Sequence, residues 1–414
     1  MSAYDVVLFG PTGVTGREVA RYLAARAPEL GMRWAVAGRD TDRMRDVLDR
    51  VGATPDAVLV ADVDDAASIE AMVESTTVVA NLVGPYARFG EAVYAACAHA
   101  GTHQLDLTGE IDWVAGMIAA YDEVATDRGA RIVPTAGFEG LPFDLGALYA
   151  AHLLHGRTGD PVVSVDAAMV TTASPSLGGL ADSVSGGTFQ SMIAALRRGL
   201  NGGMKDPYCL DPDASTAAGR HDLRPRKHPV AGHWVGPMQP SAYINPPVIH
   251  RSAALLRDSG DPMFAPDFAY REGMSTTGLA PGPAAIPAAV VLSMTAAGFA
   301  GIGSLPDALR LPIADFLARV GLQPGDGPRP EDLDRWSYRI DVRATDARGA
   351  TQDVSVNAHG HPGYKSTATM VGEAALALAG SDVPDGAGFL TPATALGLES
   401  LDRFSAAGVE FVAH

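Results

Sequence analysis

Short apolar runs alternate with amphipathic stretches from residue 4 to residue 134 of the chain. The runs are apolar along almost their whole length, as parallel strands covered on both faces are. Between them, apolar residues recur at helical spacing, as at Ile69, Met72 and Val73. The predicted strands cover residues 4–9, 33–37, 57–61, 78–83, 104–107 and 130–134. This order predicts an α/β fold with a doubly wound parallel sheet of the Rossmann type.

The pattern changes after Gly137. Alternating residues at 336–342 and 351–357 flank a polar turn, which predicts an antiparallel hairpin, and residues 162–172 form another long strand candidate. Such strands belong to an inserted α+β domain rather than to the parallel sheet. We therefore expect a dinucleotide-binding Rossmann domain at 1–140, a substrate domain at 141–362, and C-terminal helices that pack back on the first domain at 363–414.

The first predicted strand runs directly into a glycine-rich turn and a helix. The turn is Gly10, Pro11, Thr12, Gly13, Val14, Thr15 and Gly16. Gly10 would permit a tight turn, Gly13 the close approach of the backbone to a pyrophosphate, and Gly16 the packing of helix on strand. Amides of the first helical turn would then bind the negative charge. An ordinary glycine turn is the alternative, but strand and helix flank this turn where nucleotide binding requires them.

The end of the second strand bears on the choice of nucleotide. Arg39 stands where an arginine accommodates the 2′-phosphate of NADP, whereas the neighbouring Asp40 could serve the 2′-hydroxyl of NAD. We expect NADPH, with a solvated arginine as the alternative reading of Arg39. Ligands of open parallel sheets bind beyond the carboxyl ends of the strands. Further cofactor contacts are therefore expected from Asp62, Asn81, Gly84, Pro85 and Tyr86.

Reduction by a nicotinamide needs a group that stabilises the oxyanion or enolate and a group that supplies a proton. Our catalytic candidates are Tyr86, His103 and Tyr364, with Lys365 beside the last of them. Tyr86 could equally be a packing residue. His103 precedes a strand and could be an ordinary core or edge histidine.

Two acids lie near the fifth strand, and their role is open. Asp106 and Glu110 could take part in chemistry or could brace the turn at Thr108 and Gly109. No Tyr-x-x-x-Lys pair follows this strand, and the chain has no GxSxG or zinc-ligand motif. We therefore expect no metal site.

Charge and cysteine content narrow the class of protein. The net charge of -17 argues against a nucleic-acid partner, since phosphate backbones need a basic face. Cys97 and Cys209 are the two cysteines, which suits a reducing compartment without a disulfide framework. The chain runs from Met1 almost directly into its first strand, without the segments of a signal peptide. We expect a cytoplasmic protein.

Two stretches of unusual charge are candidates for partner contacts. Residues 273–306 carry no charge, but prolines interrupt them, so a buried core helix is the leading expectation, ahead of a lipid-facing or acyl-pocket wall and of a membrane span. Residues 219–228 are strongly basic and form either a solvated loop or a docking site for an acidic carrier protein or a phosphate-bearing substrate. Peripheral membrane association and a homodimer are both compatible with these patterns.

Several motifs together resemble the saccharopine dehydrogenase-like family. They are the glycine turn, Ala37-Gly38-Arg39, residues 81–90, residues 101–110 and residues 137–144. Later segments are similar to the actinobacterial, mycobacterial-type trans-acting enoyl reductases. Those segments are Ser185-Gly186-Gly187-Thr188, Asp206-Pro207-Tyr208 and His361-Pro362-Gly363-Tyr364. The resemblance covers nearly the whole chain.

The resemblance implies an NADPH-dependent reductase of an enoyl double bond on an apolar polyketide or lipid acyl chain. It would act in trans on a chain held by a synthase, with the acyl group bound to a carrier protein or to coenzyme A. Two alternatives remain open: a non-catalytic nucleotide- and lipid-binding protein, and a carbonyl or imine reductase of the saccharopine dehydrogenase type. Fold alone does not separate them.

Overall fold

The computed structural model of the chain describes residues 2–175, 186–199, 205–211, 219–277, 282–323, 327–380 and 382–414. Ser185, part of one motif above, and residues 278–281 of the uncharged stretch lie outside them. The chain forms two compact units. The first comprises Met1–Thr108, Trp113–Leu141 and Gly360–Ala407, and the second Gly109–Asp112, Pro142–His359 and Gly408–His414.

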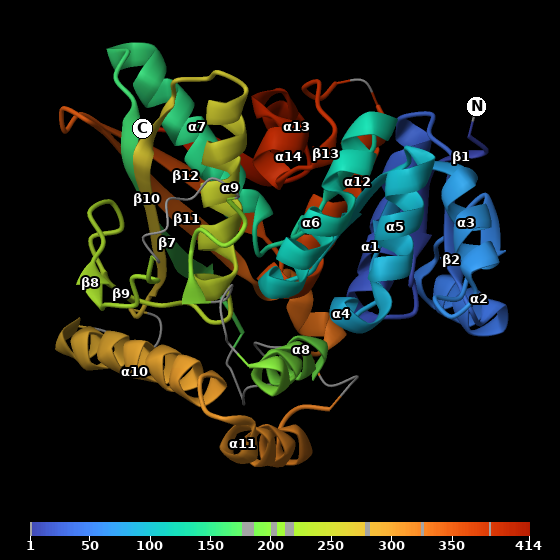
Figure 1. Cartoon of the computed structure of the whole chain (residues 1–414), viewed down its shortest axis with the longest axis horizontal. Coiled ribbons are helices and arrows are strands. Elements are labelled where there is room, and N and C mark those ends of the chain that lie inside the picture. Colours follow the sequence, from blue (N-terminus) through green and yellow to red (C-terminus); the bar gives the residue numbers. More distant parts are fainter. Residues whose placement is uncertain are drawn as a thin grey trace. The chain divides into compact units, whose positions relative to one another are not determined.

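The first unit contains a seven-stranded parallel sheet with the strand order β13-β6-β5-β4-β1-β2-β3 (Figure 1). Its strands are β1 (Tyr4–Phe9), β2 (Trp34–Gly38), β3 (Ala57–Val60), β4 (Thr76–Asn81), β5 (His103–Asp106), β6 (Arg131–Val133) and β13 (Gly388–Phe389). Its helices include α1 (Val14–Glu29), α2 (Thr41–Val51), α3 (Ala66–Glu74), α4 (Tyr86–Phe89), α5 (Glu91–Ala100) and α6 (Ile111–Arg128). The predicted Rossmann fold is confirmed. Val78, Val79 and Ala80 of β4 are fully buried because helices cover both faces of the sheet.

The C-terminal segment completes the first unit through a buried carboxylate. It contains α12 (Thr367–Ala379), α13 (Pro392–Leu396) and α14 (Leu401–Ala406). Glu373 of α12 accepts hydrogen bonds from Tyr22 Oη (2.5 Å), Arg26 Nε (2.9 Å) and Arg403 Nε (2.5 Å). This one side chain therefore joins α12 to α1 and to α14.

The second unit contains a mixed seven-stranded sheet with the order β14-β12-β11-β7-β10-β9-β8. Its strands are β7 (Val162–Ala173), β8 (Arg226–Lys227), β9 (Trp234–Gly236), β10 (Phe264–Ser275), β11 (Ser337–Asp346), β12 (Thr351–His359) and β14 (Val409–Ala413). β7 and β10 are parallel, and the other pairs are antiparallel. The predicted hairpin is present as β11 and β12.

The last strand differs from the expected helical C-terminal segment. After α14 the chain turns at Gly408 (φ +89°), and β14 pairs with β12 in the second sheet. The sequence Val409-Glu410-Phe411-Val412-Ala413 alternates only weakly, so its pairing depends on the partner strand rather than on its own pattern. Residues 408–414 thus belong to the second unit, and not with the helices before them.

Four further helices flank or border the second sheet. They are α7 (Leu141–Thr158), α9 (Asn245–Asp258), α10 (Ala285–Gly303) and, beyond α10, α11 (Asp307–Val320), which packs on α8 (Gly186–Arg198) rather than on the sheet. Gly146 of α7 lies close to the sheet, because a β-carbon there would be 3.1 Å from Val356 and 3.4 Å from Val342. That face of the sheet is apolar, whereas the opposite face carries charged residues.

Candidate functional site

The three glycines of the turn after β1 have different constraints. Gly10 has a left-handed backbone (φ +93°), which favours glycine. A β-carbon on Gly16 would lie 2.3 Å from the Gly10 carbonyl oxygen, so only glycine lets α1 pack this closely on the turn. A β-carbon on Gly13 would meet nothing nearer than 3.9 Å. The fold needs glycine at positions 10 and 16. Beside Gly13 there is a space that the fold does not use.

The start of α1 is suited to an anion. Gly13 is the N-cap residue, and no side chain caps the helix or places an acid in its first turn. The N–H groups of Val14, Thr15 and Gly16 come at this end, where an α-helix has no intrahelical partners for them. The positive end of the helix dipole adds to their attraction for a phosphate.

An unpaired donor lies at the end of β4, next to this turn. Asn81 is fully buried, and its Oδ1 accepts a hydrogen bond from Val83 N (3.0 Å). Its Nδ2 is buried without a hydrogen-bond partner. Leu82 N donates to Phe9 O (2.9 Å), which fixes the end of β4 beside the end of β1. A buried donor without a partner is costly, so the Nδ2 group fits a ligand such as a dinucleotide.

On the other side of β1, the end of β2 carries an exposed arginine. The acids that follow β2 and β3 already accept hydrogen bonds from the backbone. Arg39 follows β2 and is exposed. Asp40 caps α2, since its Oδ1 accepts from Arg43 N (2.9 Å). Asp62 follows β3, and its Oδ1 accepts from Asp64 N (3.1 Å). Because Asp40 is engaged as a cap, Arg39 is the group better placed to bind an adenosine phosphate, which favours NADP over NAD.

Tyr86 follows Gly84 and Pro85 and begins α4, at the predicted edge of the sheet. Its hydroxyl donates to Asn81 O (3.1 Å) and accepts from Leu107 N (3.2 Å). The side chain therefore links the ends of β4 and β5. This use of the hydroxyl supports the packing interpretation of Tyr86 more than a role as proton donor.

His103 is at the wrong end of its strand for a catalytic role. In the pairing of β4 with β5, His103 lies opposite Val78, whereas Asp106 lies opposite Asn81. His103 is thus at the amino edge of a parallel sheet, and ligands bind at the carboxyl edge. Its Nδ1 accepts from Arg131 N (3.2 Å), and burial, with the charge of Arg131, lowers its pKa to about 4. The register and the lowered pKa favour the interpretation of His103 as a neutral edge histidine over a catalytic role.

Tyr364 remains at the carboxyl edge. It lies in a short π-helical turn, Pro362–Ser366, that precedes α12 and is buried beside His361, with ring centroids 5.0 Å apart. Thr367 follows this turn, and its Oγ1 accepts from Phe138 N (3.1 Å) in the loop after β6. Tyr364 therefore lies three residues before a side chain that contacts the loop after β6, and its catalytic role stays a prediction.

A carboxylate braces the ends of β5 and β6. Asp106 is fully buried, with Oδ1 accepting from Thr108 N (2.9 Å) and Oδ2 from Tyr94 Oη (2.5 Å). Thr135 N approaches the same Oδ1 (3.4 Å), and Thr135 itself has a left-handed backbone (φ +59°). Burial raises the pKa of Asp106 to about 6 in spite of these donors. The bracing interpretation of Asp106 therefore fits the structure.

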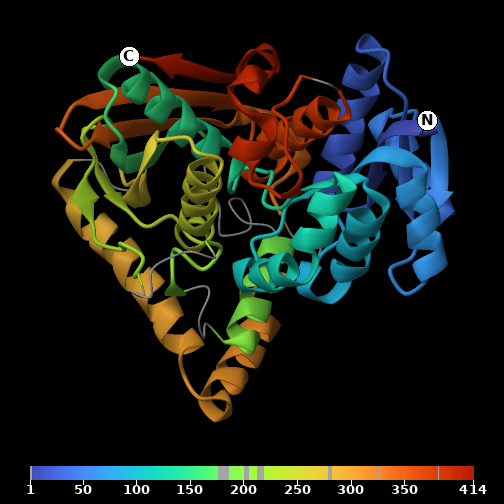
Figure 2. The ribbon, with the colours of Figure 1, turned by 45° about the horizontal axis from the view of Figure 1, so that its top comes forward.

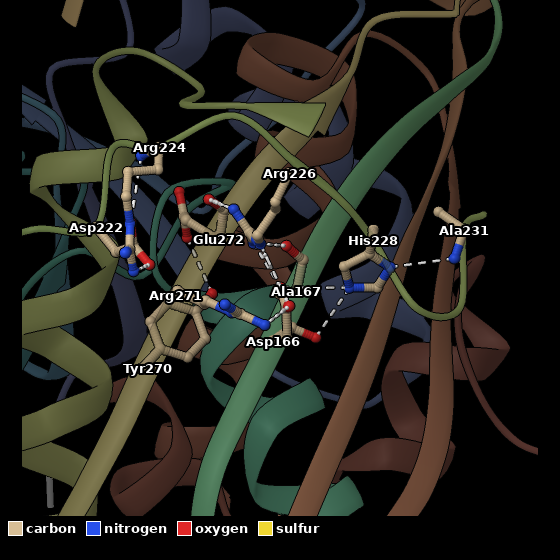
Figure 3. Close-up of polar contacts among 10 residues, drawn as sticks. All are labelled: Asp166, Ala167, Asp222, Arg224, Arg226, His228, Ala231, Tyr270, Arg271 and Glu272. Atoms are coloured by element: carbon tan, nitrogen blue, oxygen red, sulfur yellow. Dashed lines mark hydrogen bonds and ion pairs between the residues drawn. The ribbon is translucent and has the colours of Figure 1, made fainter. Parts of the chain in front are cut away.

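The second unit contains a cavity of about 470 Å³ with charged walls. A row of alternating charges crosses four strands beside it: Arg271 on β10, Asp166 on β7, Arg343 on β11 and Asp353 on β12, each opposite the next. Figure 3 shows Asp166 of this row with its neighbours Arg226, His228 and Arg271. It pairs with Arg226 (2.5 Å) and Arg271 (2.7 Å).

Two of the four arginine and lysine side chains in the basic stretch at 219–228 form ion pairs within the protein. Arg224 pairs with Asp222 (2.8 Å), and Arg226 pairs with Asp166. His228 is fully buried, donates from Nε2 to Asp166 O (3.2 Å) and accepts at Nδ1 from Ala231 N (3.1 Å). Burial lowers the pKa of His228, which agrees with a neutral ring. Arg224 and Arg226 are thus engaged within the protein, and docking of an acidic carrier at this stretch stays a prediction. Glu110, the other acid near the fifth strand, forms an ion pair with Arg198 (2.9 Å).

Comparison with known proteins identifies the first unit and the whole chain. Residues 6–133 match the family model of the saccharopine dehydrogenase NADP binding domain. A trans-acting enoyl reductase of Mycobacterium ulcerans is 34% identical, covering 98% of this chain and 96% of the relative. One of Mycobacterium tuberculosis is 33% identical, with the same coverage of both chains.

Two solved structures share the fold at low sequence identity. Homospermidine synthase from Legionella pneumophila aligns with a TM-score of 0.56 at 9% identity, over 99% of this chain and 90% of that one. Saccharopine dehydrogenase from Saccharomyces cerevisiae aligns with a TM-score of 0.50 at 14% identity, over 99% of both chains. The glycine turn, Arg39 and Asn81 all lie within the residues that match the NADP binding domain. The chain therefore belongs to the saccharopine dehydrogenase-like family, together with the relatives named trans-acting enoyl reductases, and is an NADP-dependent oxidoreductase.

Proposed function

We propose that this protein reduces the enoyl double bond of an apolar polyketide or lipid acyl thioester held by a separate synthase. The observation that carries the redox part is the nucleotide cradle: a turn whose Gly10 and Gly16 are required by the fold and whose Gly13 leaves an unused space. The choice of an enoyl substrate is supported by the names of relatives 33% and 34% identical over nearly the whole chain.

The cofactor, when bound, supplies a hydride to the β-carbon of the unsaturated thioester, and a proton must then reach the α-carbon. The chain's own part is to hold the nucleotide, to exclude water and to stabilise the enolate oxygen. The first-turn amides of α1 and Asn81 Nδ2 would hold the nucleotide. Tyr364 is our candidate for the proton, since the hydroxyl of Tyr86 links two strands.

The function can be tested with purified protein, NADPH and an α,β-unsaturated acyl thioester carried by coenzyme A or by an acyl carrier protein. We expect consumption of NADPH and formation of the saturated thioester, followed by absorbance and mass spectrometry. Faster turnover on the carrier protein would support action in trans, and equal rates would remove the need for a carrier. Reduction of ketones or imines alone would replace the proposal with its carbonyl or imine reductase alternative.

The proposed proton donor has its own test. A folded Tyr364→Phe variant should bind NADPH normally and turn over more slowly. Tyr86→Phe should instead lower thermal stability, since it removes the link between β4 and β5. If Tyr364→Phe turns over at the wild-type rate, the proton comes from another group.

A further inference from the structure

The two helices α10 and α11 expose an unusual amount of aliphatic surface. Among the described residues, eight of the eleven large hydrophobic side chains with high exposure lie on these two helices. They are Ile286, Val290, Val291, Met294, Leu309, Leu311, Phe316 and Val320. We call these side chains the apolar ridge, without Leu311, which helical spacing places on a different side of α11 from Leu309, Phe316 and Val320. The orange helices that carry it follow one another along an outer edge of the second unit (Figures 1 and 2).

α10 is not the buried core helix that the sequence led us to expect. By length and composition, the helical segment Gly282–Gly303 could cross a membrane, but only 17% of its most apolar window is buried. Its inner side meets α8 and α11 in a small cluster that includes Ile193, Leu196 and Ala314. An apolar helix with so little cover needs something else against its outer face.

The polar groups of α10 narrow the choice of what covers it. Ser293 Oγ donates to Ala289 O (3.0 Å), and Thr295 Oγ1 donates to Leu292 O (2.8 Å). At the end of the helix, Ser304 Oγ donates to Ala300 O (2.6 Å). Each hydroxyl is therefore satisfied by its own helix. That is the arrangement needed in a medium that offers no hydrogen bonds, whereas a protein interface normally has a polar rim.

The acidic side chains of α11 are likewise already paired within the protein. Both of its acids are in ion pairs, Asp307 with Arg310 (2.7 Å) and Asp315 with Arg197 (2.9 Å). In a chain with 48 acidic residues, the described helices α10 and α11 thus carry no acid outside an ion pair, although the whole protein would be repelled by an anionic surface. The ridge is complementary to uncharged acyl chains beneath zwitterionic headgroups.

We propose that the apolar ridge of α10 and α11 inserts into the acyl layer of a zwitterionic lipid surface and holds the protein there peripherally. A ridge on the protein surface, rather than a spanning helix, fits α10 because one of its sides packs on α8. This proposal does not depend on the enoyl reductase activity, because lipid binding is measured without NADPH or substrate.

The test is flotation of the full-length protein with phosphatidylcholine vesicles. Met294 (68% exposed) and Phe316 (63%) are changed together to glutamate, and Val60, which is 62% exposed on β3 of the first unit, is changed to glutamate as the matched control. We expect wild type and Val60→Glu to float with the vesicles and the double variant to stay behind by at least about tenfold. Circular dichroism checks that all three proteins are folded.

A labelled cysteine reports insertion directly. Met294→Cys can be labelled with an environment-sensitive dye, because burial raises the pKa of Cys209 to about 12 and Cys97 is fully buried. A blue shift on adding vesicles is expected, and the same dye at Val60→Cys should show none. Equal flotation of the wild type and the double variant, or no flotation of either, overturns the proposal. A fall from dimer to monomer in the double variant, with no lipid binding by wild type, would assign the ridge to a second copy of the chain.

Discussion

Two buried aspartates, one in each sheet, show how differently the two units treat the same side chain. Asp106 ends a strand of the first sheet and receives neutral donors, among them Tyr94, Thr108 and Gln104. Asp166 lies within a strand of the second sheet and receives the guanidinium groups of Arg226 and Arg271. The first arrangement shapes a loop at the carboxyl edge of the first sheet, and the second joins β7 to β8 and β10 beside the cavity.

The difference shows that two buried carboxyl groups can be compensated in different ways. Neutral donors do not offset the loss of solvation at Asp106, and burial therefore raises its pKa. The guanidinium groups at Asp166 compensate the loss of solvation of its carboxylate. If the acid is removed, they are left without their counter-charge, which destabilises the fold. Substitutions of these two residues and of their surroundings should therefore change the free energy of unfolding by different amounts and with different pH dependence.

The largest effect is expected from Asp166→Ala. Arg226 would be left nearly buried without its acid, which should lower the free energy of unfolding by about 4 kcal/mol. Asp353→Ala, in the same row of charges but with both partners partly exposed, should cost less than about 1 kcal/mol. Urea unfolding measures both. Equal losses for the two variants would mean that burial of the pair does not determine its contribution.

The next effect separates two glycines of the first unit. Gly16→Ala places a β-carbon against the Gly10 carbonyl and should lower stability by about 3 kcal/mol. Gly13→Ala meets no close atom and should change stability by no more than about 1 kcal/mol. It should nevertheless weaken NADPH binding by about tenfold or more, because the methyl group occupies the space left for the pyrophosphate. Unchanged NADPH affinity in Gly13→Ala would argue against this position of the nucleotide.

A smaller effect is expected from the pH dependence at Asp106. Its pKa is raised above the unfolded value, so the native state binds the proton more tightly, and the stabilisation by that proton is lost as pH rises through about 6. Between about pH 4.5 and 6.5 the wild type should lose about 2 kcal/mol that Asp106→Asn does not lose. Urea titrations at several pH values compare the two proteins. Parallel curves would show that Asp106 is ionised throughout this range.

The smallest effect concerns the choice of nucleotide. Arg39→Ala should raise the dissociation constant of NADPH by about tenfold and leave that of NADH unchanged. Fluorescence titration with both nucleotides measures the preference. Arg43→Ala, one helical turn further on, is a matched exposed control. If Arg43→Ala has the larger effect, the phosphate lies over α2 rather than at the end of β2.

The sequence by itself determined the first sheet and its glycine turn. Fully apolar strands, helical spacing between them and Gly10, Gly13 and Gly16 are local features, and parallel strands joined by helices leave few other topologies. The hairpin of β11 and β12 was predictable for the same reason, since its two strands and its turn are neighbours in the chain. Asp106 could be read as a brace because Gln104 and Thr108 lie beside it in sequence.

Only the tertiary structure decided the features that depend on residues far apart in the chain. The pairing of Asp166 with Arg226 and Arg271 joins separate segments, and no spacing in the sequence marks it. His103 looked available until its strand register placed it at the amino edge. The apolar composition of α10 was evident, but whether that surface is covered depends on how the surrounding elements pack. Periodicity records which residues favour burial, and the packing of distant segments decides which of them are buried.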